Sequence, residues 1–234
     1  MYYNEKIYLD NINKDEIKII FELGCGDLFN TFKLFAYYGA TIYSFECNPE
    51  CIIECEENLN LMKKYVKDKI VLVKKAVSEK NGYVSFYPFD ITKFNNKGAS
   101  SMLKIDFSMR NMNDPDYNKP NPQKEIVVES TRLDTFMKMS NILQIDLLCI
   151  DLQGYELNAI KSLGDKLKNV KYILTSTAIQ STYTNGATFK ELESFLLEFN
   201  FKYCCSTTYE YGYPDLTLTG YSEFDALFIN ENEC

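Results

Sequence analysis

Histidine is absent from all 234 residues of the chain. Without an imidazole, the usual Ser-His-Asp and Cys-His arrangements of nucleophilic catalysis are excluded. Any general base must therefore be a carboxylate, a lysine, a tyrosine or a cysteine. The absence also argues against zinc at Cys47, Cys51 and Cys55, although their spacing would place the last two on one helix face. We interpret these thiols as partly buried side chains and expect no metal site.

The chain also lacks the features of an exported or membrane-spanning protein. None of its eight cysteines belongs to a CxxC pair, so we expect no disulfide framework and a reducing compartment. No window approaches the roughly 20 apolar residues of a membrane span, and residues 1–16 lack the basic start and apolar core of a signal peptide. We expect a soluble, cytoplasmic protein.

Basic residues are outnumbered, with 25 Lys and Arg against 33 Asp and Glu. A surface of this charge repels polyanions, so no nucleic-acid partner is expected. The 46% hydrophobic content, with 16 Phe and 18 Tyr, is sufficient for one sizeable core. We predict a single domain over residues 1–234 with its core at about 18–230. The oligomeric state is left open.

Short apolar runs alternate with amphipathic segments, which predicts an α/β fold with a doubly wound, mostly parallel sheet. Strands are expected at 18–23, 41–46, 69–77, 82–89, 125–131, 144–151, 170–177, 201–207 and 223–230, and helices at 29–39, 48–65, 155–167 and 188–200. No helix separates the last two strands, so they should form an antiparallel hairpin. A stretch at about 90–124, rich in Asn, Lys, Ser and Pro, is interpreted as a polar surface insertion that shapes an acceptor pocket.

Two glycines one residue apart, Gly24 and Gly26, follow the first strand. In doubly wound sheets this loop lies where ligands bind, although a GxG pattern alone also fits a plain strand-to-helix turn. Glu22 precedes the loop, and Glu46 ends the second strand, where an acid can accept both hydroxyls of a ribose. The third glycine of a dinucleotide loop is missing, which favours S-adenosylmethionine over NAD. Glu22 would suit the ammonium group of its methionine part.

Several segments together resemble FkbM-type methyltransferases over about residues 18–230. They are IIFELGCGDLFNTFKLFAYYGATIYSFECNPE, KKAVSEKNGYVSFY, STRLDTF, IDLLCIDLQGYELNAIKSL and EFDALFIN. The resemblance implies a class I methyltransferase fold that transfers a methyl group from S-adenosyl-L-methionine to a hydroxyl, often of a sugar, a glycan-like compound or a polyketide.

The resemblance also implies which residues bind the donor. Gly24, Cys25 and Gly26 would lie under the methionine part, and Glu46 would hold the ribose. The other implied donor-binding residues are Cys47 and Asn48 in the loop after Glu46, Ala76 and Val77 beside the adenine, and Asp151 beside the transferred methyl group.

The chain departs from the family pattern at several positions, most of which carry an acid in the family. Glu22 replaces the usual Asp, and Cys47 stands where the family has proline. Gln153 replaces a frequent Glu, and Ser176 or Thr177 stands near the place of another. The two lost acids argue against a metal site. They also leave weak or absent catalytic activity as an alternative.

Asp151 is the candidate general base or hydroxyl-orienting group. The alternatives are a cap of the following helix and a partner of the donor's amino group. Glu156 and Tyr183 are candidate acceptor contacts. Their alternatives are a carboxylate that stabilises the dipole of its helix and a solvated loop tyrosine.

The sequence therefore predicts an S-adenosylmethionine-dependent O-methyltransferase that acts on a small-molecule or glycan hydroxyl. A nucleoside-binding or interaction module of the same fold is the second hypothesis. An NAD-dependent oxidoreductase is the third.

Overall fold

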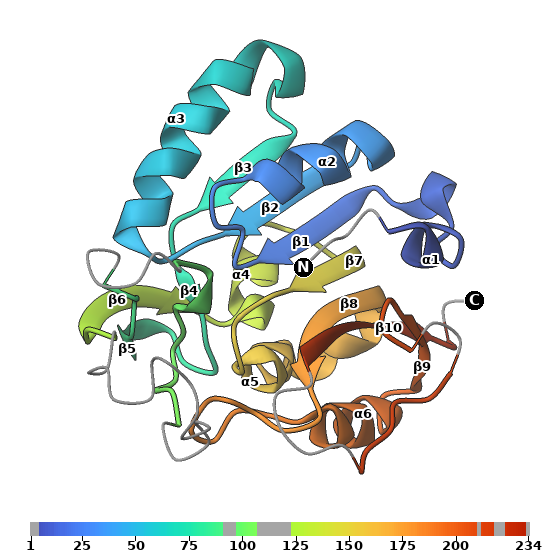
Figure 1. The fold of residues 1–234 in the computed structure, drawn as a ribbon. Helices are drawn as coiled ribbons and strands as arrows, with labels where there is room; N and C mark the ends of the chain where they lie inside the picture. The colour runs from blue at the N-terminus through green and yellow to red at the C-terminus, as the bar shows by residue number, and fades with distance from the viewer. Residues whose placement is uncertain (1–4, 91–96, 107–122, 210–211, 218–222, 233–234) are drawn as a thin grey trace.

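The computed structural model describes residues 5–90, 97–106, 123–209, 212–217 and 223–232. They form a central seven-stranded sheet in the order β3-β2-β1-β7-β8-β10-β9 (Figure 1). Its strands are β1 (Ile19–Leu23), β2 (Thr41–Phe45), β3 (Ile70–Val73), β7 (Ile145–Ile150), β8 (Val170–Ala178), β9 (Phe201–Ser206) and β10 (Glu223–Asn230). Neighbours from β3 to β8 pair in parallel, and β10 runs antiparallel to both β8 and β9.

The predicted α/β class, the mostly parallel sheet and the antiparallel final pair are confirmed. The sequence did not predict the order of the last two strands. In the structure, β10 lies between β8 and β9, and β9 forms the edge of the sheet. The apolar side chains of β10 explain its position. Ala226, Leu227 and Phe228 are fully buried, so this strand has both faces covered, as an interior strand requires.

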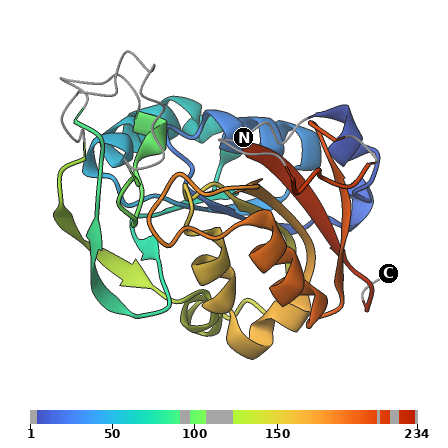
Figure 2. The same ribbon diagram turned by 60° about the horizontal axis from the view of Figure 1, so that its bottom comes forward.

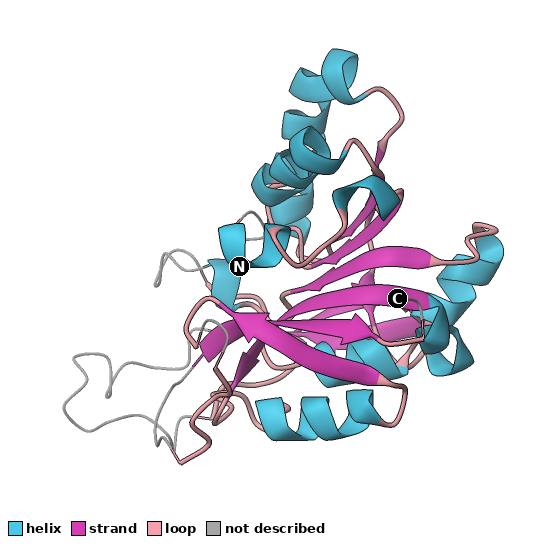
Figure 3. Ribbon diagram, turned by 90° about the vertical axis from the view of Figure 1, so that its right-hand side faces the viewer, coloured by secondary structure: helices cyan, strands magenta, loops and turns pink. Residues whose placement is uncertain are grey.

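Helices cover both faces of the sheet (Figure 3). They are α1 (Lys6–Leu9), α2 (Phe29–Tyr38), α3 (Pro49–Val66), α4 (Leu133–Met139), α5 (Glu156–Lys161) and α6 (Phe189–Leu197). Alternate residues of β1 point to opposite faces: Phe21 and Leu23 pack with residues of α4, α5 and α6, whereas Ile20 packs with residues of α1 and α2. Within the described ranges, no helix is long and apolar enough to cross a membrane.

The predicted strand 69–77 is wrong as one element, because the chain leaves the main sheet after β3. Lys75 N–H donates to Val73 O (2.9 Å) in a turn, and β4 (Ala76–Val77) then joins a second sheet in the order β4-β6-β5. The partners are β5 (Gly82–Phe86) and β6 (Ile126–Thr131). Figure 2 shows β5 and β6 at the left, beside the main sheet. This break brings β4 to the carboxyl end of β2.

The predicted helix 155–167 is also divided. α5 ends at Lys161, and a 3-10 segment, η4 (Gly164–Asn169), follows. Gly164 has φ +50°, a left-handed conformation that an α-helix cannot continue through. Upstream, Ser162 Oγ donates to Ala159 O (2.6 Å).

Two segments have structure that the sequence analysis did not predict. The segment before the first predicted strand includes α1, in which Tyr8 is fully buried and donates its hydroxyl to Asp225 O (2.8 Å). Residues after β6 form α4, which buries Leu133 and Met137. Both additions extend the core that supports the sheet.

The predicted insertion at 90–124 is described only at 90, 97–106 and 123–124, and its other residues lie outside the described part of the chain. A short 3-10 turn, η2 (Lys97–Ala99), begins the described segment. Ser101 is buried and donates to Gln153 O (2.8 Å), and Ile105 forms a β-bridge with Tyr183. This part of the insertion is therefore fixed to the loops that follow β7 and β8.

Candidate active site

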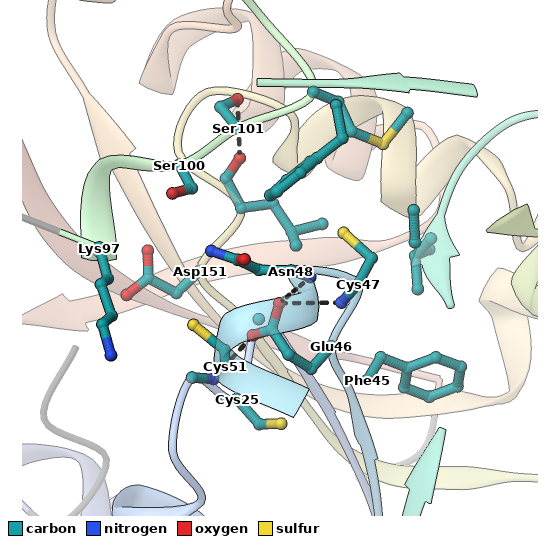
Figure 4. Close-up of a pocket in the computed structure, with 18 of the residues that line it drawn as sticks. Cys25, Phe45, Glu46, Cys47, Asn48, Cys51, Lys97, Ser100, Ser101 and Asp151 are labelled. Carbon is teal, nitrogen blue, oxygen red and sulfur yellow. Dashed lines mark hydrogen bonds between the residues drawn. The ribbon is translucent and has the colours of Figure 1, made fainter. Parts of the chain in front are cut away.

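A cavity of about 330 Å³ opens at the carboxyl ends of β1, β2 and β7 (Figure 4). This volume is in the range of small-molecule sites, and in parallel α/β sheets ligands bind at this edge. The structure brings nine predicted residues to its wall, namely Gly24, Cys25, Gly26, Glu46, Cys47, Asn48, Ala76, Val77 and Asp151. Glu22, Glu156 and Tyr183 do not line it.

The loop between β1 and α2 needs glycine at both predicted positions. Gly24 has φ +81° and Gly26 has φ +61°, conformations that side chains disfavour. A Cβ atom on Gly24 would lie 2.1 Å from the carbonyl oxygen of Asp151, whereas a Cβ atom on Gly26 would meet nothing within 4 Å. Gly24 therefore permits close packing of β1 against β7, and Gly26 permits the turn.

Glu46 is buried at the end of β2, where three backbone N–H groups hold its carboxylate. Oε2 accepts from Gly26 N–H (2.9 Å), and Oε1 accepts from Cys47 N–H and Asn48 N–H (both 2.8 Å). Burial raises the pKa of Glu46, and these donors oppose the rise. A carboxylate has about four acceptor positions, so the Gly26 contact leaves room on Oε2 for a ligand hydroxyl.

Asn48 lines the cavity and also has a structural role at the start of α3. Its side chain accepts from Glu50 N–H (3.2 Å) and caps α3, whose first residue is Pro49. This cap explains why Asn and Pro follow each other at the start of a helix. It also fixes the loop that carries Cys47.

Three thiols, those of Cys25, Cys47 and Cys51, line one part of the cavity. Cys55 Sγ lies behind them and donates to Gly26 O (2.9 Å). Contact with Cys55 and burial raise the pKa of Cys25, and burial raises the pKa of Cys47. In the described part of the chain, no cluster of three or more Cys, Asp or Glu side chains has the geometry of a metal site. A raised pKa favours the protonated thiol, so Cys25 and Cys47 present a polarisable, weakly polar surface to the cavity.

Several residues of the cavity were not predicted as site residues. They are Phe45, Phe86, Lys97, Ser101, Met102 and Tyr155. Phe86 was recognised as a strand residue, but nothing in the sequence indicated that β5 lies beside β4. Lys97 forms an ion pair with Glu54 of α3. Residues from the insertion, from β5 and from the ends of β2 and of the loop after β7 therefore complete a wall that the sequence motifs indicated only in part.

Asp151 follows β7 directly and lines the cavity, and in Figure 4 its carboxylate is on the side of Lys97 and Ser100. Gln153 Nε2 donates to Asp151 Oδ1 (2.7 Å), and Ser176 Oγ lies 3.5 Å from the same oxygen. The helix-cap alternative does not hold. The N–H groups of Leu152 and Gly154 donate to Glu156 Oε1 (3.0 and 3.1 Å). Helix α5 begins only at Glu156.

Tyr183 is buried at 6% exposure, so the alternative of a solvated loop tyrosine is wrong. Its hydroxyl donates to Ala99 O (2.9 Å) and lies 3.1 Å from Gln153 Oε1. Burial raises its pKa. Gln153, which has φ +53°, therefore connects Tyr183 to Asp151 through its amide group.

Glu22 lies beneath the glycine loop rather than on the cavity wall. Its Oε2 accepts from the hydroxyls of Thr31 and Ser44, and its buried Oε1 has no hydrogen-bond partner among the described residues. Burial raises its pKa to about 7. A direct contact with a donor's ammonium group remains a prediction.

The raised pKa of Glu22 predicts that stability falls as the pH increases. The folded state binds a proton at this carboxylate more tightly than the unfolded chain does, so the contribution is present below about pH 4.5 and is lost as the pH rises through about 7. Glu22→Gln should remove up to roughly 3 kcal/mol of this dependence. Denaturant titrations at the two ends of this window test it, with exposed Glu57→Gln as the control. An unchanged pH dependence in Glu22→Gln would show that Glu22 titrates normally.

This architecture, with a glycine loop after β1 and an acid at the end of β2, is that of the class I methyltransferases. The chain belongs to the FkbM methyltransferase family, because the model of the methyltransferase FkbM domain matches residues 25–203.

Individual relatives agree with this assignment. The chain is 26% identical to the 2-O-methyltransferase NoeI of Sinorhizobium fredii (strain NBRC 101917 / NGR234) over 168 residues. This match covers 70% of the present chain and 65% of NoeI. The fold is similar to a crystal structure of methyltransferase FkbM from Methylobacillus flagellatus KT, with a TM-score of 0.56, 10% identity, and coverage of 97% of this chain and 47% of that one. It is also similar to M. capricolum TrmK in complex with S-adenosyl-homocysteine, with a TM-score of 0.50, 12% identity, and coverage of 99% and 70%. The chain thus spans just under two thirds of NoeI and about half of the FkbM structure.

Proposed function

We propose that the chain transfers a methyl group from S-adenosyl-L-methionine to a hydroxyl oxygen of a sugar or glycan. The observation that carries the proposal is the meeting of Gly24, Gly26, Glu46 and Asp151 on one cavity beside the apolar residues of β4. Membership of the FkbM methyltransferase family supports the reaction class. The name of the 26% identical relative, a 2-O-methyltransferase, supports an oxygen acceptor.

The donor set of the cavity fits S-adenosylmethionine. Glu46 offers a fixed carboxylate to ribose hydroxyls, and Ala76, Val77 and Phe86 offer an apolar wall to adenine. Gly26 leaves space for a ligand to approach the loop, since nothing lies within 4 Å of the position of an added Cβ. The bound donor supplies an electrophilic methyl group on a positively charged sulfur.

The chain itself must orient the acceptor hydroxyl and take its proton. Asp151 is the carboxylate of the cavity that two side chains, Gln153 and Ser176, position at the end of β7. We assign to Asp151 the role of base or hydroxyl-orienting group. Because there is no histidine, no imidazole competes for it.

The proposed setting is a single domain in the cytoplasm. The cysteines of the described residues are all free, which agrees with a reducing compartment. The net charge of −8 favours a small-molecule or glycan acceptor over nucleic acid.

Calorimetry and methyl transfer together test the proposal. S-adenosylmethionine and S-adenosyl-homocysteine should bind with Kd values in the micromolar range, about −8 kcal/mol. Labelled methyl groups should then appear on a member of a glycan panel. Absence of binding would overturn the proposal, and binding without transfer to any hydroxyl acceptor would favour the non-catalytic binding module instead.

Glu46→Ala should weaken donor binding by roughly 1.5 to 3 kcal/mol, because charge-assisted hydrogen bonds to the ribose are lost. Isothermal titration with S-adenosyl-homocysteine measures the change. Glu57→Ala, on the exposed side of α3, is the matched control and should bind as the wild type does. An unaltered affinity in Glu46→Ala would remove this residue from the donor site.

Donor binding should also protect a thiol. Cys47 lines the cavity and is half-buried. Cys204 is also half-buried but lies on β9, at the edge of the sheet and far from the cavity in the strand order. Saturating S-adenosyl-homocysteine should therefore slow alkylation of Cys47 roughly tenfold or more, as expected for ligand at many times its Kd. Peptide mass spectrometry after timed iodoacetamide treatment follows both residues. Equal rates with and without ligand at Cys47 would place the ligand elsewhere.

A further inference from the structure

Gln153 has a backbone conformation that residues other than glycine seldom adopt. Its φ is +53°, and the φ of the following Gly154 is +94°. A left-handed conformation is unfavourable for a residue with a Cβ atom, and it persists only where surrounding contacts hold it in place. Gln153 stands two residues after Asp151, the proposed base, so its conformation sets the path of the loop beside the reacting groups.

Contacts from distant segments hold this conformation. Ser101 Oγ donates to the carbonyl oxygen of Gln153 (2.8 Å). The side chain of Tyr183 packs against Gly154, where an added Cβ atom would lie 3.1 Å from Tyr183 Cβ and 3.2 Å from its ring carbons. The Tyr183 hydroxyl donates to Ala99 O (2.9 Å). The loop after β7 is therefore held by the insertion and by the loop after β8.

The direction of the Gln153 amide follows from its two neighbours. Gln153 Nε2 lies 2.7 Å from Asp151 Oδ1, and a carboxylate oxygen accepts hydrogen bonds, so the amide nitrogen must face it. Gln153 Oε1 then faces the Tyr183 hydroxyl at 3.1 Å. This hydroxyl has one proton, which Gln153 Oε1 and Ala99 O share. The contacts thus form a continuous chain from η2 through Tyr183 and Gln153 to the carboxylate of Asp151.

The segment at the start of this chain of contacts also forms part of the main cavity wall. Lys97, Ser100 and Met102 line the cavity, and in Figure 4 the Asp151 carboxylate is on the side of Lys97 and Ser100. A hydroxyl bound at Asp151 would therefore lie beside this segment. The segment that lies beside the acceptor would also fix the group that takes its proton.

We propose that Gln153 and Tyr183 are positioning residues for methyl transfer: Tyr183 fixes the amide of Gln153, and this amide holds the Asp151 carboxylate toward the acceptor hydroxyl. The inference rests on the proposed function. Gln153 and Tyr183 do not line the main cavity but a second one of about 30 Å³, which has room for about one water molecule. They therefore act through Asp151 and not by contact with donor or acceptor.

The charges around Asp151 explain why an amide suits this position. Three acids at the ends of β2, α5 and β10 interact electrostatically with Asp151, and they are Glu46, Glu156 and Glu223. On its other side, Lys97 is already ion-paired with Glu54. The Gln153 amide donates to the carboxylate without adding a negative charge. An acid in its place would have to share a proton with Asp151.

Single-turnover methyl transfer tests the positioning role, with donor and a responsive acceptor at saturation. Gln153→Ala should lower the transfer rate about tenfold or more, because a small displacement of the reacting groups is costly. The KM of the acceptor and the Kd of S-adenosyl-homocysteine should change less than about threefold. Tyr183→Phe keeps the ring on Gly154 and removes only the hydroxyl, so it should lower the rate about threefold or more. Gln144→Ala, at the opposite end of β7 from Asp151, is the control.

The pH profile separates positioning from support of the fold. Gln153→Glu places a second carboxyl group against Asp151 Oδ1, and two adjacent carboxylates retain a proton to higher pH than one does. Because the base must be ionised, the acidic limb of the pH–rate profile should move to higher pH by about one unit, with the rate recovering above it. Gln144→Glu should leave the limb in place.

The outcomes are distinct. A wild type that binds no donor or transfers no methyl group would remove the proposed function and this inference with it. Normal transfer by the wild type, with unchanged rates in Gln153→Ala and Tyr183→Phe or an unmoved acidic limb in Gln153→Glu, would overturn the positioning role alone. Strongly weakened binding of S-adenosyl-homocysteine in Gln153→Ala would also overturn it and assign Gln153 to the donor site. If thermal unfolding shows that Gln153→Ala does not fold, Tyr183→Phe and the pH profile of Gln153→Glu decide.

Discussion

Asp151→Asn is expected to lower turnover roughly 100-fold or more while donor affinity changes by less than about threefold. Asparagine has the shape of aspartate and still offers an oxygen to Gln153 Nε2, which donates to Asp151 Oδ1 at 2.7 Å. It cannot take the proton of an acceptor hydroxyl. The loss should therefore fall on the chemical step and spare the binding of S-adenosyl-homocysteine.

Turnover with a responsive acceptor, calorimetry and thermal unfolding are measured side by side for this variant. Asp165→Asn, at an exposed position of η4, is the control for the same change of charge. Because Asp151 does not cap α5, the unfolding free energy should change by less than about 1 kcal/mol. Full activity in Asp151→Asn would show that the carboxylate is structural and that alignment alone supports transfer.

Gly24→Ala is expected to reduce the free energy of unfolding by roughly 3 kcal/mol or more and to impair donor binding strongly. The added methyl group would lie 2.1 Å from the backbone oxygen of Asp151. Backbone atoms of a buried strand end cannot move aside as a flexible side chain can. The positive φ of +81° adds the usual penalty for a residue with a Cβ atom.

Gly26→Ala is the matched comparison, because its φ of +61° is also positive but nothing lies within 4 Å of the added Cβ. It should cost only the conformational penalty, about 1 to 2 kcal/mol. Denaturant titration of both variants gives the difference that is due to the contact with Asp151. Equal destabilisation would mean that β1 and β7 separate at this point without cost.

Much of the donor site followed from the sequence because its residues lie in short local motifs. Gly24 and Gly26 follow an apolar strand directly, and Glu46 ends the next one. Adjacent parallel strands end at the same edge of a sheet, so once the alternation of strands and helices is recognised, these residues must come together.

The surroundings of Asp151 could not be predicted in this way. Gln153 was noted only as the loss of a family carboxylate, and Ser176 only as a residue near another lost one. The structure shows instead that both contact Asp151 Oδ1. Such contacts depend on side-chain directions in the loops after β7 and β8, which no local pattern specifies.

By itself the sequence determined the α/β class, the mostly parallel sheet, the glycine loop and the acids at the ends of β1, β2 and β7. Hydrophobic periodicity and turn residues encode these features locally. Only the tertiary structure decided that β10 inserts between β8 and β9, that β4 leaves the main sheet to line the cavity, and that Tyr183 and Glu156 are buried beside a second cavity. These outcomes depend on packing between residues far apart in the chain, because burial of an apolar face or a polar group is decided by which distant segments cover it.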